Sequence, residues 1–188
     1  DAINFMEQRL LEVHEDKSEE LIWILEHNDL YTAGTNYKEN EILDKSIKII
    51  KTNRGGKITL HSPGQKVIYF VLNLNKRKKD IRKLISIIED SIIEFLRINN
   101  INAERDKKNI GIWVNKKKIA AIGLRVTRWI AYHGCSINIS NDLRKYQKIQ
   151  PCGLSNKNVT SILNEKGKKI KNTNKNLANI FLKNLKMI

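Results

Sequence analysis

The segment IGIWVNKKKIAAIGLRVTRWIAYHGCSINI, residues 110–139, holds three apolar runs at short spacing. Residues 110–114, 119–126 and 129–139 are rich in isoleucine, valine and aromatic side chains, a composition typical of β-strands. Residues 115–117 separate the first two runs and predict a hairpin turn. The segment therefore predicts three consecutive strands of a β-sheet.

Helices are expected on both sides of this segment. Over 80–97 the apolar residues recur at helical periodicity and form one stripe, which predicts a helix that packs on the core. We expect a buried strand over 21–25 because all five residues are apolar. The other expected elements are helices over 2–14 and 177–187, strands over 47–51, 58–60 and 66–74, a loop over 31–36 and a short helical turn over 141–148. Together they predict an α+β fold, a mixed β-sheet flanked by helices.

The length of 188 residues suits a single domain, and 40% hydrophobic residues suffice for a core. No apolar run approaches the roughly 20 residues that a membrane-spanning helix needs. The first residues lack the basic and apolar regions of a signal peptide. We therefore expect a soluble cytoplasmic protein that does not bind membranes.

The net charge of +15 raises the question of nucleic-acid binding. The basic residues are spread along the chain, and the sequence has no zinc-finger spacing, no RNP-like strand and no clear helix-turn-helix. We therefore expect no nucleic-acid partner. A basic face that attracts an acidic protein is the favoured interpretation, because opposite fields steer encounter.

The loop RGGKITLHSPGQ, residues 54–65, carries residues that a structural loop does not require. Gly55 and Gly56 allow the backbone to approach a ligand closely. Arg54 and His61 are suited to orienting a polar ligand group. The alternative is a plain hairpin whose glycines serve turn geometry. The loop has neither Walker spacing nor GxGxxG, so it does not indicate a phosphate site.

Lys118 stands at the entrance of an apolar strand, at the end of a buried surface where the ammonium form of a lysine is disfavoured. The alternative is that Lys118 extends to solvent like its neighbours Lys116 and Lys117.

The two cysteines lie in different settings. Cys152 sits in a Pro-Cys-Gly turn, whose tight and exposed backbone suits a nucleophile. Cys135 lies in a predicted strand and is expected to pack in the core. His133 beside Cys135 is only a weak hint of metal binding, so we expect no metal site.

Several segments together resemble the lipoyl(octanoyl) transferase family. They are RGG at 54–56 with TLHSPGQ at 59–65, KIAAIG at 118–123, HGCSIN at 133–138, and PCGL at 151–154 with VTS at 159–161. WILEH at 23–27 and YTAGT at 31–35 also fit, so the resemblance runs from about residue 2 to 163. The chain departs from the family pattern at Leu60, Ser62, Cys135 and Ser136. These departures leave the acyl-chain preference open.

The resemblance implies a fold similar to the catalytic domain of biotin and lipoate protein ligases. It implies one catalytic domain over 1–188, without the short strand that usually precedes the first helix of the family. The implied reaction moves an octanoyl group from acyl carrier protein to a specific lysine of a lipoyl domain, the first step of endogenous lipoate synthesis. The implied acceptors are the lipoyl domains of 2-oxoacid dehydrogenase E2 subunits and the glycine cleavage H protein. No cofactor is implied.

On the same grounds Cys152 is the acyl-accepting nucleophile and Lys118 is its acid–base partner. The residues implied to bind substrate are Arg54, Gly55, Gly56, Lys57, Ile58, Thr59, Leu60, His61, Ala121, Ile122, Gly123, Gly134, Cys135 and Ser136. His133 and Asn138 are candidate orienting residues. For His61 and His133 a second acid–base role stays open beside an orienting one.

Two alternative functions remain. An ATP-dependent lipoate or biotin ligase of the same fold needs an adenylate site and no nucleophilic cysteine. A non-enzymatic basic protein that binds nucleic acid or serves as a scaffold needs neither. The transferase interpretation needs no ATP, because a thioester donor is already activated and a cysteine thiol preserves that activation.

Overall fold

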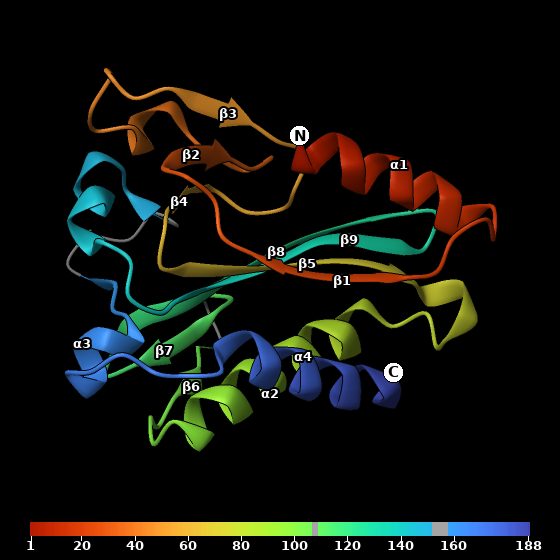
Figure 1. Cartoon of the computed structure of the whole chain (residues 1–188). Coiled ribbons are helices and arrows are strands. Elements are labelled where there is room, and N and C mark those ends of the chain that lie inside the picture. The colour runs from red at the N-terminus through yellow and green to blue at the C-terminus, as the bar shows by residue number, and fades with distance from the viewer. Residues whose placement is uncertain (107–108, 152–157) are drawn as a thin grey trace.

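A six-stranded sheet runs through the middle of the computed structural model, which describes residues 1–106, 109–151 and 158–188 (Figure 1). The strand order is β1-β5-β9-β8-β7-β6. Its strands are β1 (Leu21–Leu25), β5 (Gln65–Asn73), β9 (Ile130–Asn138), β8 (Lys117–Thr127), β7 (Ile112–Val114) and β6 (Glu104–Arg105). Neighbouring strands in this sheet pair antiparallel.

A second sheet of three strands lies on one side of the first, in the order β3-β2-β4. It comprises β2 (Leu30–Ala33), β3 (Ile49–Lys51) and β4 (Ile58–His61). β2 pairs parallel with β3 and antiparallel with β4. The predicted α+β fold with mixed strand pairing and flanking helices is therefore confirmed, and the parallel strand pair lies in this small sheet.

Helices cover both faces of the large sheet (Figure 1). α1 (Ala2–His14) lies on the same side as the small sheet, whereas α2 (Ile81–Ile98) and α4 (Thr173–Asn184) cover the opposite face. The other helical segments with both ends in the described residues are α3 (Ile162–Lys166) and the short 3-10 turns Glu39–Glu41, Leu74–Lys76, Leu143–Lys148 and Leu185–Met187. None of the helices in the described part combines the length and apolar character that crossing a bilayer requires.

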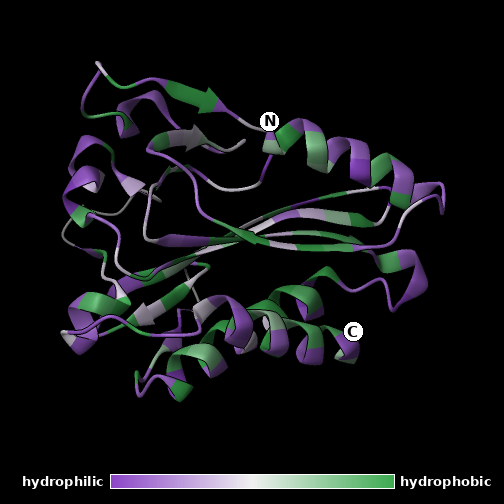
Figure 2. Ribbon diagram, viewed as in Figure 1, coloured by the Kyte–Doolittle hydropathy of each residue, from purple (hydrophilic) through white to green (hydrophobic). Residues whose placement is uncertain are grey.

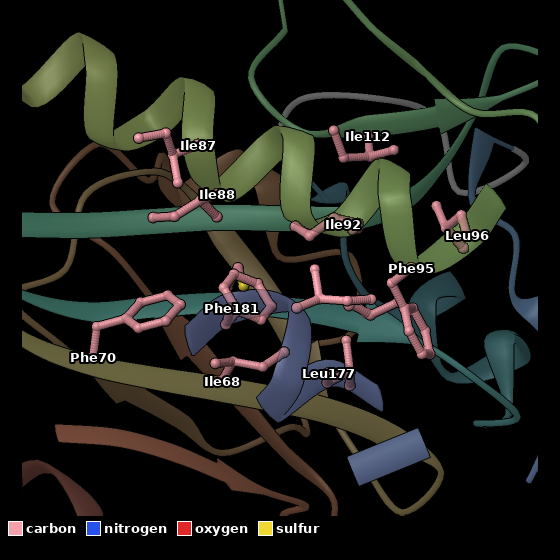
Figure 3. Close-up of a cluster of buried hydrophobic side chains, with 14 of the residues drawn as sticks. Ile68, Phe70, Ile87, Ile88, Ile92, Phe95, Leu96, Ile112, Leu177 and Phe181 are labelled. Carbon is pink, nitrogen blue, oxygen red and sulfur yellow. The ribbon is translucent and has the colours of Figure 1, made fainter. Parts of the chain in front are cut away.

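Helix α2 forms where the sequence predicts it. The Asp80 side chain accepts a hydrogen bond from the Lys83 backbone N–H at 2.9 Å and caps the first turn. Most of its apolar stripe, including Ile88, Ile92 and Phe95, is fully buried, whereas Ile81 in the first turn is exposed. Figure 3 shows this stripe against side chains from α4, β5 and β7. In Figure 2 the ribbons of α2 and α4 alternate between hydrophobic and hydrophilic residues, as expected of helices with one buried face.

Two tight turns connect the strands of the segment 110–139. Asn115 and Lys116 have φ of 48° and 62°, and Arg128 and Trp129 have φ of 51° and 62°. Two consecutive left-handed residues match the twist of antiparallel strands in a hairpin. The hairpin predicted at 115–117 is confirmed, whereas Trp129 belongs to a turn rather than to the following strand.

Three expectations were wrong. The predicted loop 31–36 begins with the rest of strand β2, whose edges pair with β3 and β4. The apolar strand β1 is not buried: it lies at the edge of the large sheet and all five residues are half-buried. The last long helix begins at Thr173 rather than 177; its first turn is polar, so the apolar pattern does not reveal it. Neither α3 nor β6 was expected.

Candidate active site

A cavity of about 350 Å³ lies between the two sheets, and both contribute to its walls. The start of α1 and the segment between β3 and β4 complete the lining. Most of the lining is apolar, with a few polar side chains among it, as is usual in sites for small organic groups.

The small sheet presents one face to this cavity. Thr32 of β2 lies opposite Ile50 of β3 and Thr59 of β4, and all three line the cavity. Side chains alternate along a strand, so their neighbours Tyr31 and Leu60 point the other way. Both pack in a separate buried cluster. The alternation along β2 and β4 therefore determines which residues reach a ligand.

The large sheet forms the facing wall. Six of its cavity-lining residues occupy two rows across β5, β9 and β8: Val67, Ser136 and Ala121 in one row and Tyr69, Gly134 and Gly123 in the next. Ala121, Ser136 and the two glycines carry small side chains or none, which leaves room above this part of the sheet. The sequence analysis did not identify Tyr69, Val67, Thr32 or Ile50. The strand 66–74 is almost continuously apolar, so its sequence does not show which of its faces lines the cavity.

The structure brings most of the predicted substrate-binding residues together around this cavity. The predicted residues that line it are Arg54, Gly56, Lys57, Ile58, Thr59, His61, Ala121, Ile122, Gly123, Gly134, Cys135 and Ser136, together with the candidate orienting residue His133. Gly55, Leu60, Lys118 and Asn138 do not line it. Cys152 lies outside the described residues.

The loop around Arg54 packs tightly on strand β8. The Gly55 backbone N–H donates to the Leu124 carbonyl at 3.1 Å, and a Cβ at Gly55 would lie 2.8 Å from that oxygen. Arg54 Nη2 donates to both the carbonyl and the hydroxyl of Thr32 at 2.9 Å. The Arg54 guanidinium thus ties the loop to the small sheet, and Gly55 permits its close approach to the large one.

His61 lies at the polar end of the cavity lining and is buried. Its Nδ1 is 2.8 Å from Oε1 of Gln65. Burial lowers the pKa of His61 to about 3, so the imidazole is neutral near pH 7. The His27 ring lies 5.7 Å from the His61 ring, and His27 Nε2 is 2.8 Å from the Tyr69 hydroxyl. Burial raises the pKa of Tyr69 to about 12.

His133 has a different partner. Its Nε2 lies 2.5 Å from Oδ1 of Asn53, and His133 is the donor because an amide oxygen only accepts. Burial lowers the pKa of His133 to about 4, and the charges of Arg54 and Arg125 act in the same direction. His133 and His61 are therefore both neutral at physiological pH, and both are equipped for hydrogen bonding.

Cys135 packs as the sequence predicted. It lies opposite Ile68 and Ile122 in the sheet and belongs to the core beneath α2 and α4. Burial raises the pKa of the Cys135 thiol, which disfavours the reactive thiolate. Within the described residues, no group of three or more His, Cys, Asp or Glu side chains is placed to hold a metal ion.

Lys118 does not extend to solvent. It is 7% exposed, whereas Lys116 and Lys117 are exposed, so the alternative interpretation of Lys118 is wrong. Its side chain passes Gly111, where a Cβ would lie 2.4 Å from Cε of the lysine. Its Nζ lies 5.5 Å from the centroid of the Trp113 ring. Strand β7 and the glycine before it thus form a slot that accommodates the lysine.

The chain that follows Cys152 returns to Lys118. Val159 forms a parallel bridge with Lys118, and the Thr160 backbone N–H donates to the Lys118 carbonyl at 2.9 Å. On the other side of Cys152, the Gln150 N–H donates to the Glu41 carbonyl at 2.7 Å. The buried lysine and the segment after the predicted nucleophile are therefore neighbours through their backbones.

The fold of this chain is similar to the folds of known ligases. Lipoate-protein ligase A bound with ATP matches with a TM-score of 0.76 over 90% of this chain and 74% of that one, at 15% identity. The biotin protein ligase of Aquifex aeolicus matches with a TM-score of 0.54 over 86% of this chain and 70% of that one, at 14% identity. The family model of the lipoyl protein ligase A/B catalytic domain matches residues 1–183. The fold and site thus define a lipoyl protein ligase A/B catalytic domain.

Similar curated sequences narrow this class. An octanoyltransferase of Wolbachia sp. subsp. Brugia malayi is 46% identical over 86% of this chain and 81% of its own length. An octanoyltransferase of Rickettsia rickettsii is 47% identical over 85% of this chain and 80% of its own length. An octanoyltransferase of Bartonella bacilliformis is 41% identical over 87% of this chain and 73% of its own length. The chain belongs to the octanoyltransferase family, within the lipoyl protein ligase A/B catalytic domains, and is an acyltransferase that acts in protein lipoylation.

Proposed function

We propose that this enzyme transfers an octanoyl group from octanoyl-acyl carrier protein to a lysine of a lipoyl domain, through a thioester on Cys152. Membership of the octanoyltransferase family supports the acyl group and the direction of transfer. The observation that carries the mechanism is the burial of Lys118 beside the segment that follows Cys152. Lys118 is only 7% exposed, and buried ionisable side chains are concentrated at functional sites.

In the first half-reaction, the Cys152 thiolate attacks the carbonyl carbon of the octanoyl thioester. A new carbon–sulfur bond forms, and the bond to the pantetheine sulfur breaks. The Lys118 ammonium gives its proton to the departing thiol. A cysteine thiol ordinarily ionises with a pKa of about 8.5, so a nearby cation increases the fraction present as thiolate at neutral pH.

In the second half-reaction, the amine of the acceptor lysine attacks the acyl-cysteine. The amide bond forms, the carbon–sulfur bond of the thioester breaks, and neutral Lys118 takes the proton that the amine loses. Cys152 leaves as a thiolate and Lys118 is again an ammonium, so the starting pair is restored. Both steps use the energy of the donor thioester, and the reaction needs no nucleotide or metal.

The cavity supports this assignment of substrate. Its apolar walls, which include Leu30, Ile50 and Val67, suit a saturated eight-carbon chain, and its volume of about 350 Å³ is ample for one. The donor partner we propose is acyl carrier protein. The proposed acceptors are the lipoyl domains of 2-oxoacid dehydrogenase E2 subunits and the glycine cleavage H protein.

The test is the intact mass of the protein after incubation with octanoyl-acyl carrier protein. We expect one octanoyl adduct, which Cys152→Ala abolishes and the matched variant Cys135→Ala retains. An adduct on Cys135, or one that survives Cys152→Ala, contradicts the mechanism. A parallel incubation with ATP, free octanoate and a lipoyl domain tests the ligase alternative. Modification of the lipoyl domain under these conditions, but not with octanoyl-acyl carrier protein, would support that alternative.

A further inference from the structure

A buried chain of hydrogen bonds lies behind the cavity. It links Thr160, Asn138, Gln65 and His61, which are between 1% and 7% exposed. Asn138 Nδ2 donates to the Thr160 carbonyl at 3.0 Å. Gln65 Nε2 donates to Asn138 Oδ1 at 2.9 Å and lies 3.2 Å from the Leu60 carbonyl. Gln65 Oε1 lies 2.8 Å from Nδ1 of His61.

This chain determines which nitrogen of His61 carries the proton. The Thr160 carbonyl only accepts, so the Asn138 amide is oriented with its nitrogen toward it and its oxygen toward Gln65. Gln65 must then direct its own nitrogen to that oxygen, which turns Oε1 toward His61. An amide oxygen accepts only, so His61 donates from Nδ1. The lone pair is consequently on Nε2.

Nε2 of His61 is available to a ligand. Within the described part of the chain it forms no hydrogen bond, and the His61 ring lines the cavity. The ring is buried and neutral at physiological pH, with Arg54 and His27 as the nearby cationic or titratable groups. The single N–H of the neutral imidazole already donates to Gln65, so the ring can act toward a substrate only as a hydrogen-bond acceptor.

We propose that His61 Nε2 accepts a hydrogen bond from a nitrogen-bound hydrogen of the substrate, and that Gln65 is the positioning residue that fixes the required tautomer. This inference rests on the proposed octanoyl transfer, whose two substrates each carry such a group. One is the amide N–H of the pantetheine arm, close to the thioester sulfur. The other is the amine of the acceptor lysine.

Two matched probes test the first source. S-octanoyl-N-acetylcysteamine carries an amide N–H two carbons from sulfur, and S-octanoyl-2-mercaptoethyl acetate has an ester oxygen in that place. Single-turnover acylation is followed by intact mass. We expect the amide probe to react about five- to tenfold faster with the wild-type chain, the effect of one hydrogen bond. His61→Leu and Gln65→Leu should bring the ratio close to one, whereas His61→Gln, which keeps an acceptor near the Nε2 position, should preserve most of it.

The second source is tested by transfer from preformed octanoyl-enzyme to a lipoyl domain. A ratio near one for the two probes, with transfer slowed about fivefold or more in His61→Leu and restored in His61→Gln, assigns the acceptor amine as the ligand. His14→Leu, a substitution of an exposed histidine, is the matched control, and melting temperatures are measured for all variants.

The proposal fails if the wild-type chain is acylated equally by both probes and transfer is unchanged in His61→Leu. It fails equally if His61→Leu slows both probes and transfer by the same factor, since that pattern reports a damaged fold. A wild-type chain that forms no acyl-enzyme overturns the proposed function and this inference together. Normal acylation without discrimination between the probes, together with unchanged transfer in His61→Leu, overturns this inference alone.

Discussion

The ammonium nitrogen of Lys118 lies 5.5 Å from the centroid of the Trp113 ring, on the neighbouring strand. Trp113 is itself 5% exposed, and its indole N–H donates to the Asn109 carbonyl at 3.1 Å. The ring is therefore held in place and presents its π-face to a cation that is largely removed from water. This contact orients the amine that the proposed mechanism uses twice.

Replacing Trp113 should affect catalysis more than substrate binding. We expect Trp113→Leu to lower kcat about two- to thirtyfold, the range of a partly desolvated cation–π contact, with little change in KM. Trp113→Phe keeps an aromatic face and should retain more of the rate at a similar melting temperature. The measurement is steady-state transfer from octanoyl-acyl carrier protein. Equal kcat values for the Leu and Phe variants would contradict the positioning role.

The proposed ion pair of Lys118 and Cys152 predicts the reactivity of the thiol. Lys118→Ala should slow alkylation of Cys152 by iodoacetamide at neutral pH, because the thiolate is the reacting form. Lys117→Ala, which removes the exposed neighbouring charge, is the control and should leave the rate nearly unchanged. Peptide mass spectrometry measures the rate at Cys152. If both variants react like the wild-type protein, Lys118 does not ionise this cysteine.

Core packing of α2 predicts a large stability difference between two isoleucines of the same helix. Ile88 is fully buried, whereas Ile98 is 52% exposed. Ile88→Ala should reduce the free energy of unfolding by about 2–5 kcal/mol, because it removes apolar contacts and leaves a cavity. Ile98→Ala should change it by about 0.5 kcal/mol or less. Urea denaturation of both variants checks this, and similar losses would mean that α2 packs differently.

Two of the histidines that line the cavity, His61 and His133, predict a loss of stability in mild acid. Burial lowers the pKa of His61 to about 3 and that of His133 to about 4, below the ordinary 6.5. Between these values the unfolded chain binds protons that the folded chain does not. The free energy of unfolding is therefore highest above pH 6.5, as far as these two histidines determine it, and it decreases as the pH falls toward 4.

Each histidine contributes a slope of up to about 1.4 kcal/mol per pH unit in that window. Urea denaturation at pH 7 and pH 5 measures the effect, above the range where carboxylates titrate. His133→Gln should make the difference between the two pH values smaller. An unchanged difference in this variant would show that His133 is protonated in the folded protein or is not buried there.

The basic surface predicts salt-sensitive encounter with the proposed carrier protein. With a net charge of +15, the enzyme should attract an acidic partner, and salt screens that attraction over about 8–10 Å. We expect KM for octanoyl-acyl carrier protein to rise several-fold between 50 and 300 mM NaCl, whereas KM for S-octanoyl-N-acetylcysteamine, an uncharged donor, stays level. If the KM for the carrier protein does not change with salt, electrostatic attraction does not contribute to its binding.

Local features were readable without coordinates. The apolar stripe over 80–97 and its Asp80 cap are short-range signals, and α2 forms there. The residues at 115–117 specify a turn between neighbouring strands, and the motifs at 54–65, 118–123 and 133–138 indicated which segments meet at the cavity. Each of these features depends on residues within a few positions of one another, or on a resemblance carried by contiguous motifs.

The direction in which a side chain points could not be predicted from the sequence, because it depends on residues of other strands and layers. The position of Lys118 at the entrance of an apolar strand left both burial and exposure open; the slot formed by Gly111 and Trp113 on the neighbouring strand is what removes it from solvent. Likewise β1 is as apolar as a central strand, yet pairing on one side only leaves it half-buried. The proton position on His61 follows from a relay through Gln65 and Asn138 to Thr160. Side chains alternate between the two faces of a strand, and local sequence does not determine which face is buried. That depends on the register with neighbouring strands and on the layers that pack against the sheet.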